Sequence, residues 1–79
     1  MLAGRKYMDG KVVRLMGNKG FGFIRGDEGK EYFFHMNDLQ GSFDELTQLQ
    51  NGGYYTEVEF TPDRTDKGLR ARSVYIKAI

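Results

Sequence analysis

Two short aromatic segments carry the side chains best suited to contact a ligand. They are residues 21–23, Phe-Gly-Phe, and residues 33–35, Phe-Phe-His. In an extended strand, alternate side chains point to opposite faces, so each segment places two rings on one face. Rings displayed beside basic side chains stack on nucleobases, and this stacking tolerates any base sequence because every base has a planar face.

Which face of these segments points inward decides the interpretation. A tight turn at Gly26–Lys30 makes the segments antiparallel neighbours, so one face collects Phe21, Phe23, Phe33 and His35, and the other Ile24, Tyr32 and Phe34. Most phenylalanines are buried, and an inverted assignment is the alternative. We assign the face with Gly20 and Gly22 to the interior, because glycine lets another layer approach closely. The four-ring face is then exposed, with Lys19 and Arg25 beside it.

The elements that position these rings are predicted to be strands. The expected ranges are residues 7–15, 21–25, 31–36, 55–61 and 69–79, with turns at Gly17–Gly20 and Pro62–Gly68. Within the long connection 37–56, Ser42-Phe43-Asp44-Glu45 matches a helix capping box and predicts one short helical turn. Five short strands without a long helix bury their apolar faces by curling into a barrel.

We therefore predict an all-β fold. It is a five-stranded antiparallel β-barrel of the oligonucleotide-binding type, with one short helical turn between strands three and four. Residues 1–6 are expected to be a loose tail, and residues 7–79 a single domain. The predicted core or core-lining side chains are Met8, Val12, Leu39, Leu46, Val58, Phe60, Val74 and Ile76.

The composition excludes several function classes. The 79 residues contain no cysteine and one histidine, which excludes disulfides and a zinc-thiolate cluster and leaves His35 without a metal-binding partner. No apolar run reaches the roughly 20 residues that span a bilayer. No nucleophile–base arrangement or phosphate-binding loop is present. We expect a cytoplasmic monomer that is not an enzyme and has no metal, cofactor or membrane partner.

Charge is distributed unevenly along the chain although its sum is +1. The balance is +5 over residues 1–25, −8 over 26–63 and +4 over 64–79. Basic ends around an acidic middle suggest an anionic partner that meets the elements built from the two ends. A solvated surface of uneven charge is an equal alternative. The candidates for contact with a phosphate backbone are Lys11, Lys67, Arg70 and Arg72.

Arg14 breaks the alternation of the first strand. Strict alternation would bury it beside Val12, and a buried unpaired arginine is improbable. We expect a bulge that turns Arg14 outward, where its guanidinium could stack on a base and pair with a phosphate.

The two aromatic segments resemble the ribonucleoprotein motifs of the cold-shock domain. Lys19-Gly20-Phe21-Gly22-Phe23-Ile24 is similar to the first motif and Glu31-Tyr32-Phe33-Phe34-His35-Met36 to the second, within a resemblance over about residues 8–77. It implies a barrel that binds single-stranded RNA or DNA and acts as an RNA chaperone or as a regulator of transcription or translation. The implied stacking residues are Phe21, Phe23, Phe33, His35 and Phe43. Lys19 would meet phosphate, and Glu31 would accept a hydrogen bond from a base.

Three departures from the family pattern stand out. Arg14 replaces an exposed tryptophan, Met36 replaces an aromatic residue, and the connection is longer around Gln48–Gly53. A methionine still covers a ring. For His35, contact with the ligand on the open face is favoured over a structural role.

Two other fold classes are compatible with parts of this sequence pattern. The RNA recognition motif shares the Lys-Gly-Phe-Gly-Phe signature, but it needs two helices and the opposite motif order, and we reject it. An SH3-like barrel that binds a peptide or protein through the same aromatic face stays open, because composition and strand number permit it.

Overall fold

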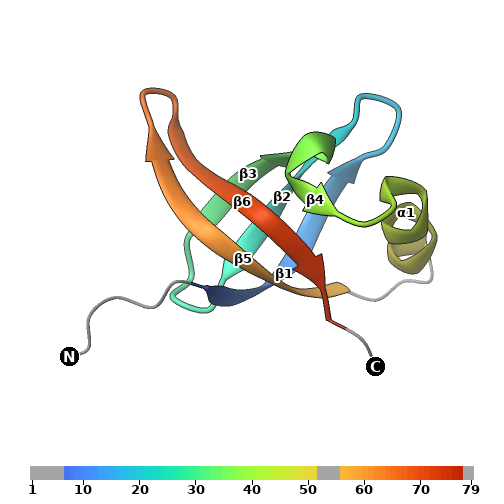
Figure 1. Cartoon of the computed structure of the whole chain (residues 1–79), viewed down its shortest axis with the longest axis horizontal. Coiled ribbons are helices and arrows are strands. Elements are labelled where there is room, and N and C mark those ends of the chain that lie inside the picture. Colours follow the sequence, from blue (N-terminus) through green and yellow to red (C-terminus); the bar gives the residue numbers. More distant parts are fainter. Residues whose placement is uncertain (1–6, 52–55, 78–79) are drawn as a thin grey trace.

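The computed structural model describes residues 7–51 and 56–77. Its strands curl around one another into a barrel, as Figure 1 shows. The elements in chain order are β1 (Met8–Met16), β2 (Phe21–Gly26), β3 (Glu31–His35), the 3₁₀ turn η1 (Met36–Asp38), β4 (Leu39–Gln40), α1 (Phe43–Asn51), β5 (Thr56–Thr65) and β6 (Gly68–Ile76).

The strand order confirms a closed barrel of five long strands. Neighbours in the sheet follow the order β3-β2-β1-β5-β6-β4, and a further pairing of β3 with β6 closes it. The pairings among β1, β2, β3, β5 and β6 are antiparallel except at this closure, where Phe33 lies opposite Arg70 in parallel orientation. The predicted five-stranded antiparallel barrel is thus confirmed, with this one closing pair in parallel orientation. The two-residue β4, also parallel to β6, was not predicted.

The interior contains the face that carries the glycines, as predicted. Ile24, Phe34 and Phe60 are fully buried. A Cβ added at Gly22 would lie 2.7 Å from the Arg14 carbonyl oxygen and 2.9 Å from the Phe34 ring, so only glycine fits there. The buried apolar residues are Val12, Ile24, Tyr32, Phe34, Leu39, Leu46, Val58, Phe60, Ala71 and Val74, with Met8 and Ile76 packed against them.

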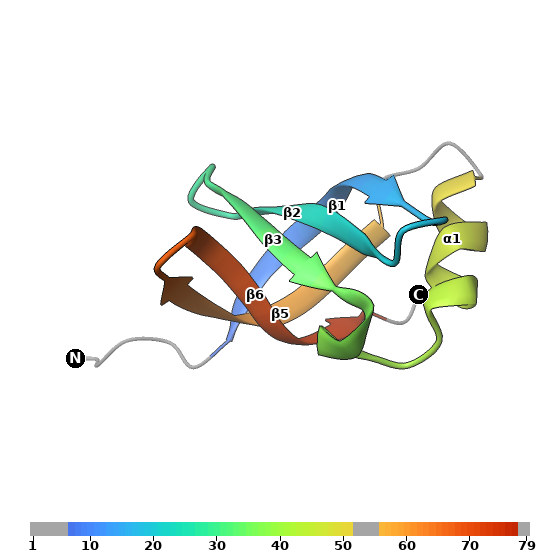
Figure 2. The ribbon, with the colours of Figure 1, turned by 90° about the horizontal axis from the view of Figure 1, so that it is seen from above.

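Helix α1 covers one end of the barrel, as seen from above in Figure 2. One of the two bonds of the predicted capping box is present, because the Glu45 N–H donates to the Ser42 hydroxyl oxygen at 3.3 Å. Leu46 is fully buried in the core. The helix spans nine residues rather than the single turn expected. The capping box identifies where a helix begins, but its length here depends on packing against the barrel.

Several strand ends differ from the predicted ranges. β5 continues through Pro62 to Thr65, so the expected turn Pro62–Gly68 is wrong at its start. Beyond Phe60, β5 no longer pairs with β1, and an edge of this kind tolerates a proline. Met36 belongs to η1 instead of the third strand. The expected tail 1–6, the strand residues 55, 78 and 79, and the chain from 52 to 54 lie outside the described residues.

Two bulges reverse the alternation of side chains. The register of β1 against β2 shifts between Val12 and Arg14, and Arg14 is exposed, as predicted. A second shift lies between β5 and β6, where Ser73 adopts a positive φ of 50°. This bulge was not predicted. It returns Val74 to the core after Arg72 has pointed outward.

Candidate nucleic-acid interface

Three phenylalanines on the outside of β2 and β3 form what we call the ring face: Phe21, Phe23 and Phe33. Phe23 lies directly opposite Phe33 in the sheet. The three centroid distances are 6.1 Å between Phe21 and Phe23, 5.6 Å between Phe21 and Phe33, and 6.0 Å between Phe23 and Phe33. These are ordinary spacings for aromatic pairs. Each ring is half-buried, so the rings support one another and still present surface to solvent.

A row of four side chains crosses the ring face and has an arginine at each end. Arg14 lies opposite Phe23 in the sheet, Phe23 opposite Phe33, and Phe33 opposite Arg70. The Arg14 guanidinium carbon is 5.2 Å from the Phe23 ring centroid, and that of Arg70 is 5.9 Å from the Phe33 centroid. Both distances are within the range of a cation–π interaction. The row is therefore a cation, two rings and a second cation.

His35 and Met36 border the ring face at the end of β3. His35 lies opposite Phe21. Its Nδ1 accepts a hydrogen bond from the Asn37 N–H at 3.1 Å, so His35 has a structural role that the sequence analysis ranked second. Because Nδ1 is the acceptor in this bond, Nε2 is the ring nitrogen that can donate to a ligand. Met36 is exposed, and its N–H donates to the Gly20 carbonyl oxygen at 2.8 Å.

A charged row borders the ring face on its other side. Lys11 lies opposite Arg25, and Arg25 opposite Glu31. The Arg25 Nη2 is 3.3 Å from the Glu31 Oε2, and both side chains are largely exposed. An exposed ion pair of this kind contributes little and opens easily. The carboxylate expected to accept a hydrogen bond from a base is therefore paired with Arg25 in this structure.

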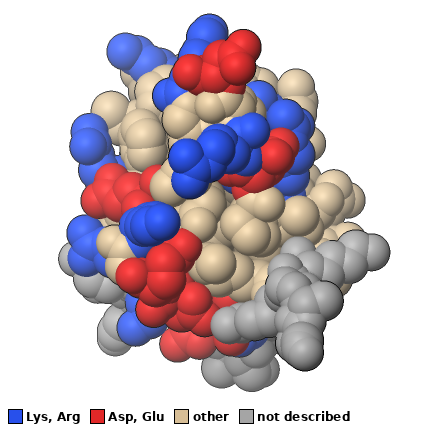
Figure 3. Space-filling view, turned by 90° about the vertical axis from the view of Figure 1, so that its left-hand side faces the viewer, with Lys and Arg blue, Asp and Glu red and all other residues tan. Residues whose placement is uncertain are grey.

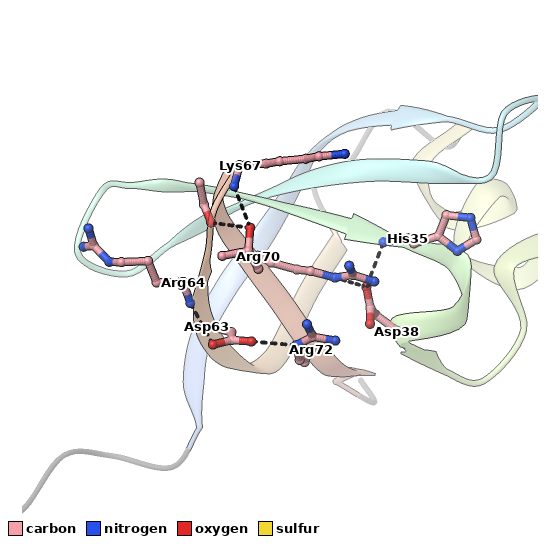
Figure 4. A network of polar contacts seen from close by, with 9 residues as sticks. His35, Asp38, Asp63, Arg64, Lys67, Arg70 and Arg72 are labelled. Carbon is pink, nitrogen blue, oxygen red and sulfur yellow. Dashed lines mark hydrogen bonds and ion pairs between the residues drawn. The ribbon is translucent and has the colours of Figure 1, made fainter.

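Asp38 is a member of this region that the sequence analysis missed. Its carboxylate is buried, and Oδ2 accepts hydrogen bonds from the His35 N–H and from the Arg70 Nε, each at 3.0 Å. Figure 4 shows it between the end of β3 and the side chain of Arg70. The local signal was a capping pattern, since His35 precedes η1 and Asp38 is its third residue. The partner Arg70 is 32 residues away and could not be inferred locally.

The remaining predicted site residues lie around this region and not within it. Phe43 opens α1 and is half-buried against the core, which leaves part of its ring exposed. Lys19 is exposed in the turn between β1 and β2. Lys67 is exposed in the turn between β5 and β6, and Figure 4 shows its side chain extending in the same direction as that of Arg70. Arg72 is paired with Asp63 at 2.7 Å.

The charge blocks of the sequence do not form one face of a single sign on the side drawn in Figure 3. There, basic and acidic side chains lie next to one another around an uncharged area. The Arg72 guanidinium holds the pKa of the Asp63 carboxyl below its usual range. Neighbouring opposite charges of this kind weaken the long-range attraction of an anion.

No group of three or more potential metal-ligating side chains exists in the part of the chain that the structure describes. None of the described helices is both long and apolar enough to cross a membrane.

Comparison with known proteins agrees with the motifs. Residues 8–77 match the family described as 'Cold-shock' DNA-binding domain. The chain is 32% identical over 66 residues to Cold shock protein 1 of Lactiplantibacillus plantarum, covering 84% of this chain and 92% of that protein. It is 37% identical over 65 residues to Cold shock-like protein CspD of Bacillus cereus, covering 82% and 91%.

Proposed function

The chain belongs to the cold-shock domain family, whose members bind nucleic acids, and we propose that it binds single-stranded RNA or DNA by stacking bases on the ring face. The observation that carries this proposal is the row of two half-exposed rings between two arginines on the outside of the barrel. Aromatic rings supply stacking surface, and basic side chains beside them supply attraction to phosphate.

The selectivity for single strands follows from geometry. A base can stack on Phe23 or Phe33 only when it is separated from its neighbours and partner, whereas a duplex hides the faces of its bases. Each base held by a ring contributes about 1–3 kcal/mol. Binding at several rings thus competes with base pairing and favours the open strand.

The cellular role that fits this activity is that of an RNA chaperone or a regulator of transcription or translation. A protein that holds open strands shifts the equilibrium away from base-paired structure by mass action. We propose that residues 7–79 act as one binding domain, as a cytoplasmic monomer without catalytic activity or a cofactor. The family match over residues 8–77 supports one unit.

Fluorescence anisotropy of labelled oligonucleotides tests the proposal. We expect the protein to bind a single-stranded heptamer at least roughly tenfold more tightly than the matching duplex. The measurement is repeated at two salt concentrations, because contacts with phosphate weaken with salt and stacking persists. Equal affinity for the heptamer and the duplex would contradict stacking as the mode of binding.

The same assay separates nucleic-acid binding from recognition of a peptide by an SH3-like barrel. An unlabelled single-stranded oligonucleotide should displace the labelled one, and a proline-rich peptide should not. Grooves that bind proline-rich segments are also lined with aromatic rings, so the proline-rich peptide is the control most able to compete for the ring face. Displacement by the peptide alone would favour the peptide-binding class.

A further inference from the structure

Asp38 and Arg70 form an ion pair with one end buried and the other at the ring face. The Nε and Nη2 atoms of Arg70 each lie 3.0 Å from the Asp38 Oδ2. The Asp38 side chain is 9% exposed and the Arg70 side chain 31% exposed. The pair thus joins η1 to β6 and ends beside Phe33.

The pair changes what Arg70 offers to a ligand. The charges of Asp38 and Arg70 cancel at this short distance, so a phosphate a few ångströms away meets little net positive charge. The guanidinium keeps its plane and its remaining N–H donors. Arg14, at the other end of the row, makes no ion pair with any of the residues that the structure describes.

Resting on the proposed function, we propose that Asp38 is a positioning residue that converts Arg70 from a phosphate contact into a stacking plane continuous with Phe33. The two arginines at the ends of the row then have different roles. Arg14 attracts phosphate, and Arg70 extends the surface on which a base lies. This assignment refines the sequence-based expectation that Arg70 contacts the nucleic-acid backbone.

A purely structural role for Asp38 is the competing explanation. Its Oδ2 also accepts the His35 N–H, and this bond holds the start of η1. An asparagine at this position retains an acceptor for His35 but removes the negative charge. The charge and the turn can therefore be tested separately.

Arg70→Lys tests the stacking plane. Lysine keeps a positive charge for Asp38 but has no planar guanidinium. We expect affinity for a single-stranded heptamer to fall about two- to fivefold at every salt concentration, with an unchanged salt slope. Arg72→Lys is the matched control on the same strand, because Arg72 pairs with the exposed Asp63 and makes no ring contact among the described residues. It should change neither quantity.

Asp38→Asn tests whether the Asp38 carboxylate neutralises the charge of Arg70. The freed Arg70 charge should steepen the slope of log affinity against log salt by up to about 0.7, the contribution of one phosphate on a single strand. Asp63→Asn, on β5 opposite Arg70 in the sheet, adds the same net charge but removes the partner of Arg72, and it controls for overall charge. We expect its slope to change by less than half as much.

The outcomes separate this inference from the proposed function. If the wild type does not bind single strands, both are overturned. If it binds and Arg70→Lys lowers the slope, or leaves affinity unchanged, the stacking plane alone is overturned. If Asp38→Asn lowers Tm with an unchanged slope, or matches Asp63→Asn in slope, the neutralisation is overturned. Should Asp38→Asn fail to fold, the result with Arg70→Lys still decides whether Arg70 is a plane or a phosphate contact.

Discussion

Phe33 and Phe34 are adjacent residues of the same type with opposite surroundings. Phe34 is fully buried in the barrel, and Phe33 is half-buried on the outside, between Phe23 and Arg70. Alternation along β3 requires that neighbours face opposite ways, but it does not say which one faces in. The difference therefore depends on what each face meets across the sheet.

A glycine on the neighbouring strand β2 determines which of the two phenylalanines faces the interior. Gly22 lies directly opposite Phe34 in the sheet, and its missing side chain leaves room for the Phe34 ring. Phe23 and Arg70 lie opposite Phe33 in the sheet, one on each side. Their side chains are on the outer face and contact the Phe33 ring. One face is thus shaped to pack closely, and the other to remain open.

Phe34→Ala should give the largest effect. Removing a fully buried ring leaves a cavity and costs about 3–5 kcal/mol, which approaches the whole stability of a domain this small. We expect a chain that is largely unfolded at room temperature, measured by circular dichroism and thermal melting. A melting curve close to that of the wild type would mean that the two faces have been assigned in reverse.

Tyr32, on the same inner face, predicts how the stability depends on pH. Burial and a hydrogen bond to the Glu28 carboxylate raise the pKa of Tyr32 from 10.0 to about 12. The folded state therefore keeps its proton where the unfolded state loses it. The contribution of Tyr32 to stability is fully present below pH 10 and is lost, by about 2–3 kcal/mol, as the pH rises through about 12.

The control for this pH effect is Tyr32→Phe. It lacks the hydroxyl, so the part of the loss due to Tyr32 should disappear while other groups titrate as before. Tm is compared for the two proteins at pH 9 and pH 12. Parallel decreases in both would show that the hydroxyl of Tyr32 is not protected by folding.

Phe33→Ala is expected to affect binding more than folding. Loss of one stacking ring should weaken binding of a single-stranded heptamer by about 1–3 kcal/mol, or about 5- to 150-fold. Because part of this ring is already in solvent, Tm should fall far less than in Phe34→Ala. A large decrease in Tm with unchanged affinity would contradict the division between the two faces.

The fold and most of the ring face could be predicted because they depend on local patterns. The alternation of side chains predicted the strands of the barrel, and the glycines predicted its inner face. The cost of burying the charge of Arg14 predicted the first bulge. The second bulge could not be predicted, since Ser73 adopts a positive φ that a serine rarely takes. The pairing of Asp38 with Arg70 depends on closure of the barrel between β3 and β6, which brings together residues far apart in the chain.

Arg14→Trp should give the smallest change in affinity, and it tests whether the binding surface extends from the ring face to Arg14. The position resembles one where the family has a stacking tryptophan, and here the exposed guanidinium lies 5.2 Å from the Phe23 centroid. The substitution removes one cation and adds a ring, so the salt slope should become shallower by about 0.7. Affinity should rise at high salt, where stacking persists, and change little at low salt, where the two effects oppose each other. An unchanged slope together with a lower Tm would mean that Arg14 stabilises the barrel instead, and that the binding surface ends at the ring face.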